Sequence, residues 1–175
     1  MNVSNRKVHK FIGLVVSVQL LLWTISGIFF SFNKIDQIRG ENYLKSVEQI
    51  TPQKISRISF EEAKELVIEK TYLKPISVEE ITEEKRGSEF RGRNLPLYKL
   101  SSLDSSDKEV NVYIDPSLGK IVAIRTFEWR LWDLMWGLHI MDWRDRDDIN
   151  NLLLKIFSIL ALISSITGII LFFRP

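Results

Sequence analysis

The chain has 175 residues, a formal net charge of +2, 45% hydrophobic residues and 26% charged residues. Its mean hydropathy of -0.00 would suit one soluble domain, but the charges are unevenly placed. Residues 11–32 contain no charged side chain and residues 152–173 contain one, Lys155. This unevenness excludes an ordinary soluble globule, and the absence of Cys excludes disulfides, a lipid-modified cysteine and thiolate chemistry.

Both apolar stretches are long enough to span a bilayer, because about 20 helical residues cover roughly 30 Å of hydrocarbon. The first follows Arg6, Lys7 and Lys10, a basic flank that a signal peptide would also have. Its apolar run is longer than the usual signal core, and residues 26–33 show no A-x-A cleavage pattern. We therefore predict that residues 11–32 form an uncleaved transmembrane helix and residues 152–173 a second one.

Charge predicts the orientation of the two spans. Residues 1–10 carry a net charge of +3, residues 33–127 are balanced, residues 128–151 carry −3 and residues 152–175 carry +2. Since basic flanks remain in the cytoplasm, residues 1–10 and the end at 174–175 are predicted to be cytoplasmic. Residues 33–127 then form an extracytoplasmic domain, and nothing in this charge distribution suggests nucleic-acid binding.

Residues 33–127 show the pattern of a small α+β domain with an antiparallel sheet. Ser59 and Glu62 form a capping box ahead of a predicted helix at about 60–72, and Pro75 follows it. Alternating residues near 76–78 and 95–100 predict strands, and a Pro- and Gly-containing turn at 115–119 joins a predicted hairpin of residues 109–114 and 120–125. Residues 87–93 are expected to be an exposed loop. The predicted fold class is a membrane α-helical hairpin, with two transmembrane helices, plus this domain.

The order of these motifs resembles a known family. The strand Leu97–Leu100 and residues 112–121 (VYIDPSLGKI) are similar to a PepSY domain, although Leu118 stands where Thr is common. Residues 6–13 (RKVHKFIG) and 23–27 (WTISG) resemble the first helix of PepSY-associated transmembrane proteins. Leu138, His139 and residues 167–171 (TGIIL) resemble their second helix.

The resemblance implies a role at a bacterial cytoplasmic (inner) membrane without fixing one reaction. PepSY modules are associated with inhibition or regulation of proteases. Larger PepSY-associated membrane proteins include haem-containing reductases that act in ferric-siderophore uptake, and these have more transmembrane helices than the two predicted here.

Residues 127–143 contain four of the five Trp residues and are predicted to form an interfacial helix within the segment 128–151. At about 100° per residue, one helix face holds a stripe of aromatic residues, namely Trp129, Trp132, Trp136, His139 and Trp143. Trp favours the membrane interface, so the stripe could be an interfacial anchor. It could instead be a docking surface for another membrane protein, or the wall of a cofactor site.

Residues 142–148 (DWRDRDD) contain four Asp residues. They could suggest a cation site, but Arg144 and Arg146 can pair with them and no calcium-loop spacing is present. We therefore predict no metal site. Asp147 and Asp148 are expected to start the second transmembrane helix, since acidic residues favour a helix N-terminus.

The chain has two histidines, His9 and His139. A haem b held by two imidazoles needs both on one side of the membrane, but the predicted topology separates them by roughly 30 Å. We therefore predict no cofactor. In the alternative, His9 and His139 are candidate haem ligands, and each would need a second ligand from another chain or of another residue type. No HExxH, P-loop or GxSxG motif occurs, so no catalytic residues are predicted.

Small residues at four-residue spacing predict close helix packing in the spans. The residues expected to support helix association are Gly13 with Ser17, Ala161 with Ser165, and Ser164 with Gly168. Gln19 is a large polar residue inside the first span, so we expect it to hydrogen-bond to the second span or to another protein.

These patterns favour a non-enzymatic, membrane-anchored accessory or regulatory subunit that docks on a larger membrane or periplasmic partner, with a role in iron uptake as one setting. The expected partners are the lipid bilayer and another membrane protein or a second copy of the chain. One alternative is a haem-binding electron-transfer subunit for ferric-siderophore reduction. A second alternative is a PepSY-type protease inhibitor.

Overall fold

The computed structural model describes residues 3–45 and 57–173, with the side chains of residues 3–9 and 171–173 left out. The end at 174–175, predicted to be cytoplasmic, lies outside the described residues. The chain divides into two compact units. The first, the helical unit, comprises Met1–Phe32 and Leu134–Pro175, and the second, the sheet domain, comprises Asn33–Asp133.

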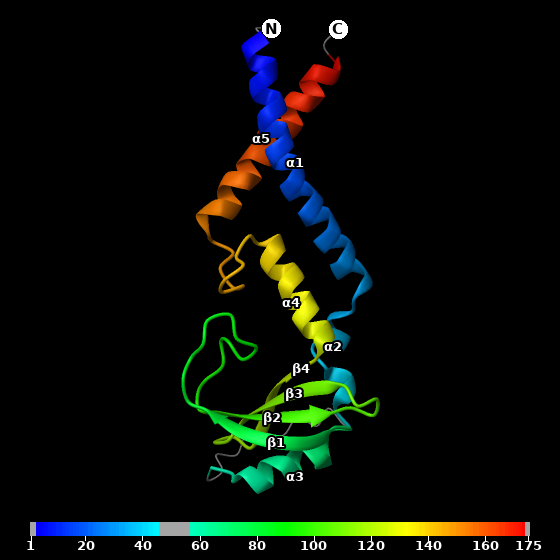
Figure 1. Ribbon diagram of the computed structural model, residues 1–175, viewed down its shortest axis with the longest axis vertical. Helices are drawn as coiled ribbons and strands as arrows, with labels where there is room; N and C mark the ends of the chain where they lie inside the picture. Colours follow the sequence, from blue (N-terminus) through cyan, green and yellow to red (C-terminus); the bar gives the residue numbers. More distant parts are fainter. Residues whose placement is uncertain (1–2, 46–56, 174–175) are drawn as a thin grey trace. The chain divides into compact units, whose positions relative to one another are not determined.

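Two long apolar helices form most of the helical unit. Helix α1 spans Val3–Phe32 and helix α5 spans Leu152–Phe173, and the two cross each other (Figure 1). Among the described residues, Lys10–Phe32 and Leu152–Ile170 are long and apolar enough to cross a membrane. The prediction of two apolar helices long enough to cross a membrane is therefore confirmed.

The sheet domain contains the predicted antiparallel sheet (Figure 1). Four strands lie in the order β1-β2-β3-β4, and each pairs with the next in antiparallel register. Their bounds are Lys74–Ile81, Leu97–Leu103, Glu109–Asp115 and Lys120–Arg125. The chain enters the domain through a short helix α2, Ile35–Ile38, and a 3-10 turn η1, Glu41–Tyr43.

Helix α3, Phe60–Lys70, packs on one face of the sheet. Ala63 and Val67 of α3 are fully buried in the main core of the domain, which also contains Leu73, Tyr98, Leu100, Val110, Val112, Ile114 and Ile124. A helix at this position follows from its sequence, because Ala63 and Val67 lie one turn apart and point to the same side.

Local signals in the sequence correctly predict the start of α3 and the turn of the hairpin. The Ser59 hydroxyl accepts a hydrogen bond from the Glu62 backbone N–H, and the Glu62 carboxylate accepts one from the Ser59 N–H. In the hairpin, the Asp115 carboxylate accepts hydrogen bonds from the backbone N–H groups of Ser117 and Leu118. These bonds satisfy backbone N–H groups that would otherwise have no hydrogen-bond acceptor within the helix or the turn.

The loop of residues 87–93 is not the exposed loop that its polarity predicts. Ser88 is buried, and the Phe90 ring contacts the Tyr113 ring at a centroid distance of 5.8 Å. Phe90 thereby helps to cover a second, smaller core formed by Leu97, Tyr113 and Ala123 on the other face of the sheet. The prediction was wrong because Phe90 covers apolar side chains on this face of the sheet, and the free energy gained by this burial outweighs the preference of the neighbouring polar residues for solvent.

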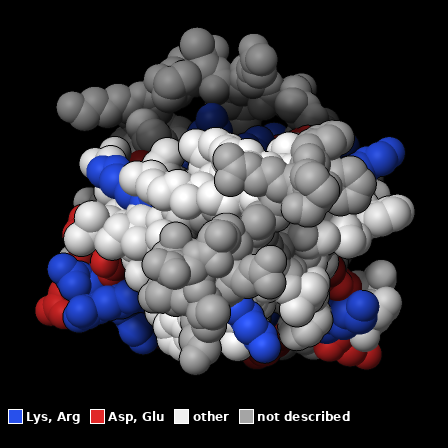
Figure 2. Space-filling view, turned by 90° about the horizontal axis from the view of Figure 1, so that it is seen from above, with Lys and Arg blue, Asp and Glu red and all other residues white. Residues whose placement is uncertain are grey.

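Helix α4 spans Phe127–His139, and the boundary between the two units falls inside it, between Asp133 and Leu134. Its first half therefore belongs to the sheet domain and its second half to the helical unit. On the face that Figure 2 shows, basic and acidic side chains lie interleaved rather than gathered by sign.

A matched pair of glycines tests the packing at the entry to the sheet domain. Gly40 has φ +74° and Gly92 has φ +71°, but a Cβ on Gly40 would lie 2.7 Å from the Ile124 side chain, whereas one on Gly92 would meet nothing within 4 Å. We expect Gly92→Ala to lower the unfolding free energy by about 1 kcal/mol. Gly40→Ala should lower it by roughly 1–3 kcal/mol more, because overpacking adds to the backbone strain.

The measurement is chemical unfolding of the full-length protein in detergent, followed by circular dichroism. Equal losses in the two variants would show that the segment carrying Gly40 does not pack against β4 as described.

Candidate functional site

The end of helix α4 is closed by backbone hydrogen bonds. Met141 has φ 57°, and the Asp142 N–H donates a hydrogen bond of 3.0 Å to the Gly137 carbonyl. This is the Schellman pattern that ends a helix. The helix therefore stops at His139, and Trp143 leaves the face that the sequence predicted for it, with 57% of its surface exposed.

The acidic turn of residues 142–148 folds around the Asp142 carboxylate. Its two oxygens accept hydrogen bonds of 3.1–3.3 Å from the backbone N–H groups of Arg144, Asp145, Asp147 and Asp148. Burial alone would raise the pKa of Asp142, but these four donors outweigh it and lower that pKa. Within the described residues, no group of three or more His, Cys, Asp or Glu side chains could hold a metal ion.

Helix α5 begins at Leu152, where the second span was predicted to begin, but Asp147 and Asp148 do not start it. The Asn151 side-chain oxygen accepts a hydrogen bond of 2.8 Å from the Leu154 N–H, so Asn151 caps the helix. Asp147 and Asp148 lie in the turn and do not start α5. The prediction was wrong because the Asp142 carboxylate takes the N–H groups of both residues.

Two side chains fix the end of α4 by binding its last carbonyl groups. The Trp23 indole N–H of α1 donates a hydrogen bond of 2.6 Å to the His139 carbonyl. The Asn151 amide donates one of 2.9 Å to the Ile140 carbonyl. Carbonyls at a helix end have no partner within the helix, so these bonds tie α4 to both α1 and the start of α5.

The His139 imidazole is held in one orientation against α1. Its Nδ1 lies 2.8 Å from the Ser26 hydroxyl oxygen. That hydroxyl also lies 2.8 Å from the Leu22 carbonyl oxygen and 3.1 Å from the Trp23 carbonyl oxygen. When it donates its one hydrogen to either carbonyl, Nδ1–H is the donor toward Ser26 and Nε2 carries the lone pair. Nε2 makes no hydrogen bond to any residue that the structure describes.

Three aromatic rings surround the His139 ring. The Trp136 ring stacks on it at 11° with centroids 6.4 Å apart, and the Phe30 ring meets it edge-on at 5.7 Å. The Trp23 ring lies at 6.4 Å. Burial among these rings lowers the pKa of His139, so the imidazole is neutral at pH 7.

The predicted stripe of aromatic residues does not form one continuous surface. Trp129 is only 8% exposed, and the Arg125 guanidinium lies 4.2 Å from its ring centroid, so it is part of the sheet domain. Trp136 packs with Phe30 and His139 in the helical unit. Trp132 is partly buried, which leaves Trp143 as the exposed member of the stripe.

Inside the membrane helices, Gln19 is 5% exposed, and its amide nitrogen has no hydrogen-bond partner among the described residues. The expected bond from this nitrogen to the second span is therefore not formed.

The small residues predicted to support helix association are mostly not at the contact between α1 and α5. A Cβ on Gly13 or Gly168 would meet nothing within 4 Å. Ser17 is exposed, whereas Ser164 is partly buried. The small residues Gly13, Ser17 and Gly168 thus lie outside the contact between α1 and α5.

The two histidines are far apart within the helical unit. His9 lies on α1 seventeen residues before Ser26, which corresponds to about 25 Å along the helix axis. Since His139 contacts Ser26, the two imidazoles cannot ligate one iron atom. The side chain of His9 lies outside the described residues.

The sheet domain contains a buried charge network that the sequence did not predict. The Glu89 carboxylate accepts hydrogen bonds from Arg130, Asn111 and the Tyr113 hydroxyl. Burial raises the pKa of Glu89, but these donors lower it further than burial raises it. Asp133, 1% exposed, pairs with Arg91. The partners lie about 20–40 residues apart in the sequence, so no local spacing signals them.

A family model described as "PepSY-associated TM region" matches residues 6–175. The chain belongs to this family. The match includes both apolar helices, the sheet domain and both histidines, so the predicted resemblance is confirmed. No curated protein and no solved structure matches this PepSY-associated protein.

The Arg91–Asp133 pair tests what the buried network contributes to the stability of the PepSY-associated protein. Arg91→Met removes the cation that pairs with the buried Asp133 carboxylate and should lower the unfolding free energy by about 3 kcal/mol. Adding Asp133→Leu should recover part of this loss, because the buried carboxylate is then removed. Lys64→Met, which breaks the exposed pair with Glu61, should cost less than about 1 kcal/mol. A double variant less stable than Arg91→Met alone would contradict this account.

The lowered pKa of His139 predicts a dependence of stability on pH. The unfolded chain takes up the imidazole proton more readily than the folded one, so the unfolding free energy should fall as pH decreases below about 6.5. Thermal melting between pH 8 and 5 in a His9→Gln background would show this slope. His139→Gln should reduce it, and an unchanged slope would mean that His139 does not titrate as described.

Proposed function

We propose that this PepSY-associated protein is a non-enzymatic, membrane-anchored accessory or regulatory subunit that contacts a larger membrane protein at the His139 site. The observation that supports it most directly is the state of this imidazole. Its backbone carbonyl, its Nδ1 and its ring face are all held within the chain, whereas Nε2 bonds to no described residue. A ring held so firmly can present Nε2 to a group outside the chain without losing further conformational freedom.

The membrane helices favour a partner within the bilayer. Gly13, Ser17 and Gly168 remain outside the contact between α1 and α5, and small residues on a helix face allow another helix to approach closely. Exposed Trp143, four residues after His139, supplies an aromatic side chain of the kind that is enriched at interfaces.

The proposed arrangement follows from the charges of the flanks. The basic residues 1–10 and Arg174 favour cytoplasmic termini in a bacterial cytoplasmic membrane, and residues 33–127 are then extracytoplasmic. In this arrangement His139 belongs to the outer side of the membrane, where it is available to a partner of the cell envelope.

Site-specific photo-crosslinking in native membranes tests this function. A benzoylphenylalanine residue at Trp143 should give one discrete crosslinked product, and the product should decrease at least fivefold when His139→Ala is added. The control position is Tyr72, which is similarly exposed, at 66%, but belongs to the sheet domain. Absence of a product at Trp143, or an equal product at Tyr72, would contradict the proposal.

The same open nitrogen favours a second candidate, a haem-binding electron-transfer subunit. An imidazole whose Nδ1 is hydrogen-bonded and whose Nε2 is free is the usual form of a metal-ligating histidine, so His139 fits one axial position of a haem. Haem would supply one-electron transfer there. Because His9 lies about 25 Å away along α1, the second axial ligand would have to be a residue of another type or come from another chain.

An absorption spectrum distinguishes the two candidates. Under the proposed function, protein purified from haem-supplemented cells is colourless, and the crosslink at Trp143 forms without haem. A stoichiometric Soret band that disappears with His139→Ala and persists with His9→Ala would establish the haem candidate instead.

A further inference from the structure

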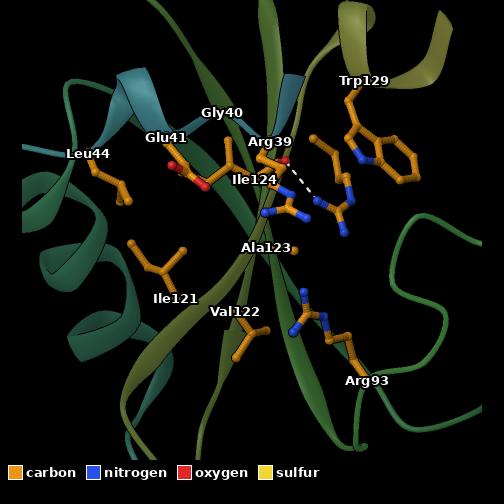
Figure 3. Close-up of a pocket in the computed structure, with 11 residues that line it drawn as sticks. Arg39, Gly40, Glu41, Leu44, Arg93, Ile121, Val122, Ala123, Ile124 and Trp129 are labelled. Carbon is orange, nitrogen blue, oxygen red and sulfur yellow. Dashed lines mark hydrogen bonds between the residues drawn. The ribbon is translucent and has the colours of Figure 1, made fainter. Parts of the chain in front are cut away.

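The sheet domain has a cavity of about 380 Å³ that opens beside strand β4. One wall is formed by β4, and the opposite walls come from the segment of residues 39–44, from Arg93 and from Trp129 of helix α4. Figure 3 shows the head groups of Arg39 and Arg93 pointing into the space beside Ala123. A cavity of this volume is within the range of small-molecule sites.

Three arginines from distant parts of the sequence line this cavity, namely Arg39, Arg93 and Arg125. Elsewhere in the domain, arginines are paired with acids: Arg57 with Glu80, Arg91 with Asp133 and Arg130 with Glu89. The side chains of Arg39 and Arg93 form no hydrogen bond or ion pair with any described residue. The cavity thus gathers arginines that, unlike Arg57, Arg91 and Arg130, have no carboxylate partner among the described residues.

Arg125 is positioned by contacts that leave its charge uncompensated by a salt bridge. Its guanidinium donates hydrogen bonds to two backbone carbonyls, those of Glu89 at 2.9 Å and Ile124 at 3.1 Å, and it lies over the Trp129 ring. Burial, followed by repulsion from Arg93, lowers the pKa of Arg125 to about 10. It therefore remains charged at pH 7, in a position where a nearby anion would be favourable.

The single acid among the lining residues is Glu41, so one carboxylate faces three guanidinium groups. Glu41 forms no ion pair with a described residue. Converging cations repel one another unless an anion lies between them. The excess of positive charge therefore favours a ligand with more than one negative charge.

We propose that this cavity binds a phosphate group. A guanidinium presents planar, paired N–H donors that match phosphate oxygens, and three of them arranged around one space match a group with three acceptor oxygens. A single carboxylate has two oxygens and can be held by one arginine. The side of the cavity formed by Ile121, Val122 and Ala123 is apolar and accommodates an uncharged remainder of the ligand.

The phosphate can belong to an anionic lipid or to a soluble molecule. Arg39 follows the end of the first apolar helix, Phe32, by seven residues, and a chain of this length spans at most about 25 Å. Both sources are therefore within reach, and the experiment has one arm for each.

In the first arm, inorganic phosphate is titrated calorimetrically into the full-length protein in phosphatidylcholine nanodiscs at constant ionic strength. In the second arm, the protein is taken from bilayers of phosphatidylcholine and phosphatidic acid, whose phosphomonoester has three free oxygens, and native mass spectrometry counts the phosphatidic acid molecules that it retains. Saturable binding of phosphate indicates a soluble ligand, and a retained phosphatidic acid indicates a lipid.

The test variant is Arg39→Gln with Arg93→Gln, because both side chains are exposed and their removal should leave the fold intact. The control is Lys74→Gln with Lys85→Gln, which removes two exposed charges from the same domain. We expect the test variant to weaken binding at least tenfold in whichever arm is positive and the control to change it less than twofold. Failure of both arms, or equal weakening by the two variants, would overturn the proposal. Circular dichroism of each variant checks that weaker binding does not result from unfolding.

Discussion

The helical unit depends on the contact between helix α1 and the last turn of helix α4. The Trp23 indole binds the His139 carbonyl, and the Ser26 hydroxyl binds the His139 imidazole. Each bond satisfies a polar group in an apolar setting, where an unpaired group would be costly. Because Trp23 and Ser26 lie nearly one turn apart on α1, they fix both the backbone and the side chain of one residue.

This contact lies where the chain ends α4. Continuing the helix to Trp143 would engage the His139 carbonyl in an ordinary helical bond, and Trp23 would then have to share that acceptor. The left-handed Met141 and the bonded Asp142 turn the chain instead, and Asn151 then starts α5 while binding Ile140. The segment of residues 140–151 thereby ends α4 and begins α5.

In the sheet domain, four ion pairs join residues that lie far apart in the sequence. Arg130 and Arg91 each bind an acid about 40 residues away, and this pairing attaches the first half of α4 to the loop of residues 87–93. The arginines around the β4 cavity have no such acidic partner among the described residues, which is why we propose a binding site there.

Sequence reasoning predicted what depends on short spacings and missed what depends on tertiary contacts. The capping box at Ser59 and the hairpin turn at Asp115 involve residues within three positions of each other, so both were predictable. The end of α4 was not, because Met rarely adopts the left-handed conformation that Met141 has. The Asn151 cap could have been recognised, since Asn directly before an apolar run is a helix-start signal, but the nearby acids obscured it. No local signal marks the pairing of Glu89 with Arg130 or the convergence of Arg39, Arg93 and Arg125.

The proposed function depends most on His139 being held with Nδ1 protonated toward Ser26 and with Nε2 open. Nitrogen-15 NMR of the imidazole tests this directly, on full-length protein in nanodiscs with His9→Gln so that a single histidine is observed. We expect one tautomer near pH 8, with the proton on Nδ1 and an unprotonated Nε2, and we expect Ser26→Ala to shift the Nδ1 resonance. A proton on Nε2, or a rapid average of both tautomers that Ser26→Ala leaves unchanged, would contradict it.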